Sequence, residues 1–147
     1  MNLEDPYASD ELNESSSSSR PITHHWELEV YRIAMDLSTQ LFQESRHWPL
    51  EEKFSLIDQI RRSSRSVTAQ IAEGWRKRRY RAAFISKLND AEGEAAESQT
   101  WIEHAVRCAY LPRERGLAIH SRYNDVIGKL VVMQNNPEPW LLPGHRD

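Results

Sequence analysis

Apolar residues recur every three or four positions through most of the chain after residue 25, the spacing that gives a helix one buried face. Proline-containing breaks or a glycine followed by a basic run separate four such segments, and none shows the two-residue alternation of a strand. Because the connections are short, neighbouring helices should be antiparallel. The sequence therefore predicts an all-α protein, an up-and-down antiparallel four-helix bundle, with helices over residues 26–46, 49–74, 79–109 and 113–135.

Each predicted helix has an apolar row that should form the core. The second helix has the cleanest one, with Leu56, Ile57, Ile60, Ser64, Val67 and Ile71 within about 100° of arc. The third helix carries Phe84, Leu88, Ala91, Ala95, Ser98, Ile102, Val106 and Ala109. For the fourth helix we expect Gly116, His120, Tyr123, Ile127, Leu130, Val131 and Gln134 to face inward. The first helix has two adjacent rows and thus a broad apolar face.

The bundle should be flanked by two tails. Residues 1–25 are acidic and serine-rich and predict a disordered segment, residues 26–136 the bundle, and residues 137–147 a proline-rich tail. The single cysteine, Cys108, excludes an internal disulfide and favours a reducing compartment. Without a signal peptide or an apolar run of about 18 residues, we expect a cytoplasmic protein with no membrane partner.

The net charge of −3 hides a strong local asymmetry. Residues 1–20 hold five acids and one arginine, whereas residues 59–81 hold eight lysines or arginines and one acid, a net +7. Tyr80 and Trp75 interleave aromatic rings with this basic run, a combination that suits phosphates and stacked bases. The predicted nucleic-acid contacts are Arg62, Arg65, Trp75, Arg76, Lys77, Arg78, Arg79 and Arg81.

The same arginines allow a second interpretation, in which they are solvated or paired with acids. The third helix has an unusual face on which acids accompany a tryptophan, and this face could meet the arginines of the second helix within a subunit or between subunits. Under this hypothesis the oligomer interface comprises Arg61, Arg62, Arg65, Asp90, Glu94, Glu97 and Trp101. The arginines would then make intersubunit salt bridges in a protein-interaction module.

The sequence gives only weak signals for catalytic or metal-binding groups. One Glu-x-x-His pair, Glu44 with His47, lies at a helix end, whereas a di-metal bundle needs two such pairs facing inward. His104 and Cys108 are one turn apart but lack a second ligand pair, and His120 is expected in the core. Glycine-rich phosphate loops and serine-nucleophile elbows are absent from the sequence. We therefore predict no enzyme, cofactor, metal or small-molecule substrate.

The segment from Arg61 to Trp75, RRSSRSVTAQIAEGW, followed by Arg78, resembles a known family signature. That signature, roughly R-R-x-x-x-S-[IV]-P-x-N-I-A-E-G-[YW]-x-x-R, belongs to the bacterial four-helix bundle family that includes the protein encoded in intervening sequences of 23S rRNA genes. The resemblance spans about residues 26–134. This chain departs from it at Thr68, where the family has proline, at Gln70, where it has asparagine, and at Glu94, where it has serine. Losing the proline should straighten the second helix.

The resemblance implies a bundle that assembles as a ring-like homopentamer. A related branch, the accessory variability determinant of diversity-generating retroelements, is a partner of a reverse transcriptase and binds nucleic acid through a basic surface. For this chain, the resemblance thus implies a non-enzymatic homo-oligomer that engages RNA or a nucleic-acid-handling protein such as a reverse transcriptase.

Overall fold

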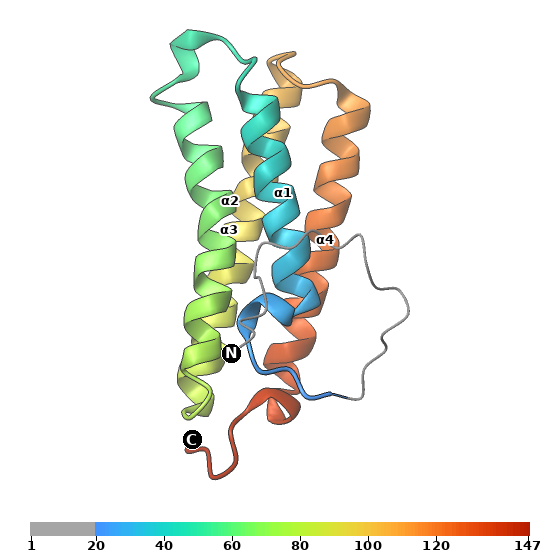
Figure 1. The fold of residues 1–147 in the computed structure, drawn as a ribbon. Helices are drawn as coiled ribbons and strands as arrows, with labels where there is room; N and C mark the ends of the chain where they lie inside the picture. The colour runs from blue at the N-terminus through green and yellow to red at the C-terminus, as the bar shows by residue number, and fades with distance from the viewer. Residues whose placement is uncertain (1–19) are drawn as a thin grey trace, which may run out of the picture.

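The computed structural model describes residues 20–147, and the acidic stretch of the predicted tail at residues 1–19 lies outside them. Four long helices lie side by side: α1 (Glu29–Ser45), α2 (Leu56–Arg76), α3 (Arg81–Arg107) and α4 (Arg113–Asn135). Figure 1 shows them running up and down in turn, each packed on its neighbours around a closed ring. The predicted antiparallel four-helix bundle is confirmed.

Three short 3-10 helices occupy the ends of the bundle: η1 (His25–Glu27), η2 (Leu50–Glu52) and η3 (Glu138–Trp140). Two of them explain errors in the predicted helix starts. The first helix begins at Glu29 rather than residue 26, because Leu28 is extended after η1. The second begins at Leu56 rather than near Pro49, because Pro49 to Ser55 form η2 and a turn.

Side chains at the α1–α2 connection account for the late start of α2. The Glu52 carboxylate accepts hydrogen bonds from the Ser55 hydroxyl (2.6 Å) and from the Leu56 backbone N–H (3.1 Å). It therefore satisfies one of the N–H groups that the first turn of a helix leaves unpaired. Trp48 is buried against the core and holds this connection to the bundle. Sequence periodicity carries no signal for these contacts.

Burial confirms the predicted core row of α2 in full and that of α3 in large part. All six predicted residues of α2 are buried, and the α3 row is buried from Phe84 to Ile102. Beyond Ile102 the prediction is wrong: Ala105 is buried, Val106 is half-buried and Ala109 is exposed. The helix already ends at Arg107, and Ala109 has a positive φ of 61°.

The buried face of α4 is rotated from the predicted one. Its buried residues are Gly116, Ile119, Tyr123, Val126, Leu130 and Met133, whereas His120, Ile127, Val131 and Gln134 are only half-buried. Gly116 fixes this rotation, because a Cβ there would lie 2.4 Å from Val106 Cγ2. Sequence periodicity predicted a single inward face for α4, and the close approach to α3 selects a face rotated from it.

Helices α2 and α3 approach each other closely along their length. The Ser98 hydroxyl donates to the Ser63 hydroxyl (2.8 Å) inside the core, and a Cβ on Gly74 would lie 3.1 Å from Lys87 Cβ. Gly74 therefore sits within α2 as a contact point and does not end the helix, which continues to Arg76. This packing fixes the outward direction of the α2 arginines.

Replacing Ile60 with alanine should reduce the free energy of unfolding by about 2–5 kcal/mol. Ile60 is 0% exposed at the centre of the α2 row, so the substitution removes apolar contacts and leaves a cavity. Urea unfolding followed by circular dichroism measures the loss.

Tyr123→Phe is the matched control, since it changes a buried residue without opening a cavity. The Tyr123 hydroxyl is buried and makes no hydrogen bond within the described residues. Removing it should change the unfolding free energy by less than about 1 kcal/mol, because no partner is left unsatisfied. Equal losses in the two variants would contradict this account of the core.

Candidate nucleic-acid interface

The basic run after Gly74 forms the end of α2 and the turn into α3. Arg76 ends the helix, Lys77 to Tyr80 make the turn, and Tyr80 is extended before α3 begins at Arg81. The third helix therefore starts two residues later than predicted. As Figure 1 shows, this turn lies at the same end of the bundle as residues 136–147, which we call the C-terminal segment.

The C-terminal segment is attached to this turn by backbone hydrogen bonds. Arg146 donates its N–H to the carbonyl of Arg79 (2.8 Å) and accepts one from the N–H of Arg81 (2.7 Å). Leu142 N–H donates to the Arg78 carbonyl at 3.3 Å. These bonds place a further exposed arginine, Arg146, beside the basic turn. The sequence pattern does not indicate this residue, because nothing local relates position 146 to position 79.

The exposed cations of this end are Arg76, Lys77, Arg79 and Arg146, and we call them the basic end. Within residues 20–147, no carboxylate lies within 4 Å of their charged groups. The ring of Tyr80 is 49% exposed beside them. The arrangement combines free positive charge with an accessible aromatic ring.

Two predicted contacts instead serve the structure. Trp75 is only 3% exposed, and its indole N–H donates to the Thr23 carbonyl at 3.4 Å, so its ring is closed to a stacked base. The guanidinium carbon of Arg78 lies 3.6 Å from the centre of that ring, and its Nε donates to the Trp75 carbonyl (2.7 Å). Burial, and then the charge of Arg76, lower the pKa of Arg78.

Arg81, a third predicted contact, forms an ion pair with Glu138 of η3. Its charge is therefore partly neutralised by the C-terminal segment. Together, the eight predicted contacts divide into cations that are free at the basic end, residues that hold the end together, and two arginines higher on α2, which are Arg62 and Arg65.

Residues 20–28, which we call the N-terminal segment, pack beside the basic end, and its positive charge affects the pKa of His25. Burial, and then the positive charges of His24 and Arg76, lower the pKa of His25. The segment is held by Glu27, whose carboxylate accepts hydrogen bonds from the backbone N–H groups of Thr23 (2.8 Å) and His24 (2.9 Å). Glu27 also forms an ion pair with Arg20.

The arginines of α2 that were predicted to meet the acidic face of α3 separate into two groups. Arg62 and Arg65 line a polar groove of about 270 Å³ with Glu94 and Glu97. Burial raises the pKa of Glu94, and the neighbouring Glu97 adds to this. Arg61 faces α1, where its Nε donates to the Ser45 hydroxyl at 2.9 Å. Arg65 lies between the two surroundings, since its guanidinium carbon is also 5.7 Å from the centre of the Phe42 ring of α1. Within the subunit Arg61 therefore contacts α1, and its role in an interface between subunits stays a prediction.

The remaining residues of the predicted acidic face have partners within the chain. The Trp101 indole N–H donates to Glu97 (3.3 Å), and the Asp90 carboxylate lies 3.9 Å from the Lys87 ammonium group. Lys87 also pairs with Glu73 at 3.2 Å. The structure thus brings Arg62, Arg65, Glu94 and Glu97 together and leaves Asp90 apart from the arginines.

Candidate metal ligands do not converge in the described part of the chain. No group of three His, Cys, Asp or Glu side chains within residues 20–147 is placed to hold a metal ion. The Glu44 carboxylate forms an ion pair with Arg115, whose Nε lies 2.9 Å from Oε1. Cys108 is exposed and lines an open hollow with Trp101 and His104. Across the same residues, no helix combines the length and apolar character that crossing a membrane requires.

Fold and surface together define a small up-and-down helical bundle whose most distinctive feature is a basic end. The chain belongs to the family of 23S rRNA-intervening sequence proteins, since the model of that family matches residues 26–132. The predicted family membership is confirmed.

A solved structure supports the same assignment. The chain is similar to a protein of unknown function from the S23 ribosomal protein family of Bacteroides thetaiotaomicron, with 29% identity and a TM-score of 0.66. The match covers 73% of this chain and 99% of the other. No curated protein matches the chain.

Replacing Glu27 with glutamine should destabilise the protein in a pH-dependent way. Burial acts to raise the pKa of Glu27, but hydrogen bonds from His24 and Thr23 and the charge of Arg20 outweigh it and lower the pKa from 4.5 to about 2. Because the folded pKa is depressed, the stabilisation is present above about pH 4.5 and is lost as the pH falls toward 2. We expect a difference of roughly 1–3 kcal/mol at neutral pH that shrinks at acidic pH.

Urea unfolding at several pH values measures this difference. Glu114→Gln is the control, since Glu114 is exposed on α4, and its substitution should change stability by less than about 0.5 kcal/mol. A Glu27→Gln effect that stays constant from neutral pH to about pH 2 would show that the carboxylate charge is not what holds the N-terminal segment.

Proposed function

We propose that this protein is a non-enzymatic RNA-binding homo-oligomer, a pentamer in its assembled form, that contacts RNA phosphates through the basic end. The carrying observation is the cluster of four exposed cations, Arg76, Lys77, Arg79 and Arg146, with no described carboxylate within 4 Å. Bound phosphates would supply the missing negative charge and release counterions.

The structure of the basic end favours a polyanion over a single small anion. Its cations come from two distant parts of the chain, which backbone hydrogen bonds between Arg79, Arg81 and Arg146 hold together. The exposed Tyr80 ring adds a surface on which an unpaired base can stack, a contact worth about 1–3 kcal/mol per base. A structured RNA with a loop offers both phosphates and unpaired bases.

Family membership adds to this proposal. The family is described by its link to intervening sequences of 23S rRNA, and the solved neighbour is assigned to an S23 ribosomal protein family. A cytoplasmic location and a nucleic-acid-handling partner such as a reverse transcriptase would fit a protein that holds RNA without processing it. We include both as parts of the proposal.

The triple variant Arg76→Gln, Lys77→Gln, Arg79→Gln should bind a hairpin RNA at least about tenfold more weakly at moderate salt. The slope of log affinity against log salt should also fall by roughly two to three, because each lost phosphate contact removes one released counterion. Fluorescence anisotropy with a labelled hairpin RNA measures both quantities.

Lys53→Gln, Arg107→Gln, Arg113→Gln is a matched control that removes the same charge from exposed positions away from the basic end. It should keep most of the affinity and the salt slope. If the two triple variants lose affinity equally, binding depends on total charge and the basic end has no special role. An unmutated protein that binds no RNA at low salt would contradict the proposal altogether.

A second candidate function is a protein-interaction module without RNA binding. The observation that favours it is the groove in which Arg62 and Arg65 lie beside Glu94 and Glu97, a surface carrying both signs of charge. Two copies could pair such surfaces by exchanging salt bridges. Two variants separate the two functions: loss of assembly in light scattering when Arg62 and Arg65 are replaced with glutamine favours this one, and loss of RNA from intact assemblies when Arg76, Lys77 and Arg79 are replaced favours the first. A monomer at all concentrations contradicts assembly in both.

A further inference from the structure

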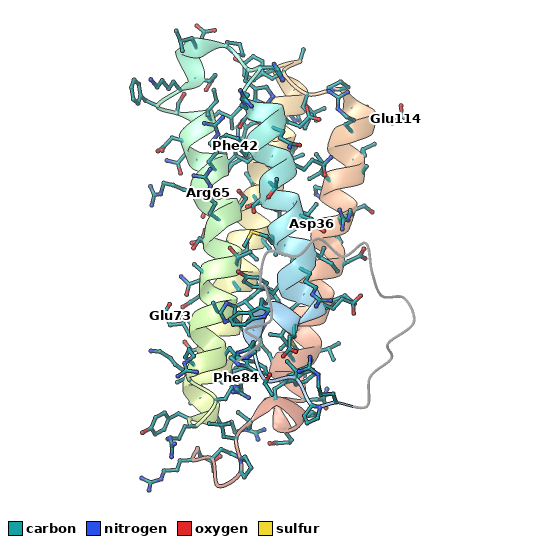
Figure 2. The ribbon with its side chains drawn as sticks, in the orientation of Figure 1. Asp36, Phe42, Arg65, Glu73, Phe84 and Glu114 are labelled. Atoms are coloured by element: carbon teal, nitrogen blue, oxygen red, sulfur yellow. The ribbon has the colours of Figure 1, made fainter. Side chains whose placement is uncertain are left out.

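A second group of arginines surrounds a single aromatic ring between α1 and α2. The guanidinium carbons of Arg61, Arg65 and Arg46 lie 4.8, 5.7 and 5.9 Å from the centre of the Phe42 ring. Figure 2 shows Phe42 and Arg65 next to each other where α1 faces α2. We call these four residues the Phe42 cluster.

The arginines of the Phe42 cluster form no ion pair with a described carboxylate, although Arg65 also lines the groove that contains Glu94 and Glu97. Within residues 20–147, none of its arginines has a carboxylate within 4 Å, and Asp58, the acid nearest to them along α2, forms no ion pair. Burial, and then the like charges of Arg65 and Arg46, lower the pKa of Arg61. The ring offsets part of this repulsion by cation–π attraction, and an external anion would offset more.

The geometry leaves donors available for such an anion. Only one guanidinium donor in the cluster has a described hydrogen-bond acceptor, Arg61 Nε on the Ser45 hydroxyl at 2.9 Å. Arg46 and Arg65 are exposed. A guanidinium group held over a ring keeps its edge free for two parallel hydrogen bonds to a phosphate.

One arginine of the Phe42 cluster, Arg65, and one of the basic end, Arg76, lie on one row of α2. Arg65 and Arg76 are eleven residues apart, which is three turns plus about 20°, so they share a face roughly 16 Å apart. The intervening residues on that row are Ala69, which is exposed, and Ala72, which is half-buried, and both have small side chains. Glu73 lies to one side and is paired with Lys87.

We propose that the Phe42 cluster is a second phosphate-contact site, which together with the basic end forms one track along α2 for an extended nucleic-acid backbone. This inference rests on the proposed RNA binding. Arg61 and Arg76 are fifteen residues apart, about 22 Å along the helix, whereas successive phosphates of one strand are ~3.4 Å apart along the axis of a DNA duplex and slightly closer in A-form RNA. An RNA duplex of about seven to eight base pairs is therefore the shortest that spans the track.

The double variant Arg46→Gln, Arg65→Gln tests the track with two hairpin RNAs, one with a 4-base-pair stem and one with a 12-base-pair stem. Both residues are exposed and donate no side-chain hydrogen bond within the described chain, so the fold should be retained. We expect about tenfold weaker binding of the long hairpin and a salt slope lower by roughly two, with the short hairpin unchanged within about twofold.

Arg107→Gln, Arg113→Gln is the control, because it removes two exposed charges away from α2. It should leave both hairpins unaffected within about twofold. Phe42→Leu is a further variant that keeps every charge but removes the ring. It should weaken the binding of the long hairpin and leave the binding of the short hairpin unchanged.

Several outcomes would overturn the track. Equal loss for both hairpins means that the cluster does not act as a distant second site, and no loss for either means that it binds no phosphate. Dissociation of assembled subunits in light scattering would place these arginines at a protein interface. If the unmutated protein binds neither hairpin, the proposed RNA binding fails and the track with it. If it binds both while the double variant behaves as unmutated, only the track fails.

Discussion

The close packing of α2 on α3 is the constraint on which the rest of the structure depends. Ser63 and Ser98 share a hydrogen bond of 2.8 Å in the core, and a Cβ on Gly74 would be in tight contact with Lys87 Cβ, at 3.1 Å. Because the two helices approach this closely, the apolar row of α2 must face the core of the bundle. The arginines on the other side of α2 are then directed away from the core, and their charges remain available.

Polar groups attach both the N-terminal segment and the C-terminal segment to the bundle end that carries the basic turn. Glu27 arranges the N-terminal segment through backbone hydrogen bonds, and Trp75 fixes it to α2. The C-terminal segment is bonded to the α2–α3 turn through Arg146. A surface made in this way gains its cations from two separate stretches of sequence, and a third stretch, the N-terminal segment, packs beside it. Its arginines differ in role, since Arg78 holds the structure while Arg79 faces solvent.

Burial separates residue types that look alike in the sequence. Trp75 and Tyr80 both interleave with the basic run, yet only Tyr80 has an accessible ring, because the N-terminal segment covers Trp75. Likewise Arg61, Arg62 and Arg65 form one group by spacing, but Arg61 contacts α1 and Arg62 faces Glu94 across a groove. Differences of this kind come from contacts between segments distant in the chain, which local pattern cannot contain.

The sequence by itself determined the helical class, the family, the number of long helices and the α2 core, because apolar spacing and a local motif carry that information. The bounds of α4 were also predicted correctly, since Pro112 and the Asn136–Pro137 step lie at its ends. Only the tertiary structure decided the buried row of α4, where Gly116 must approach Val106. It alone brought Arg146 to Arg79 and three arginines to Phe42, because long-range packing sets which charges become neighbours.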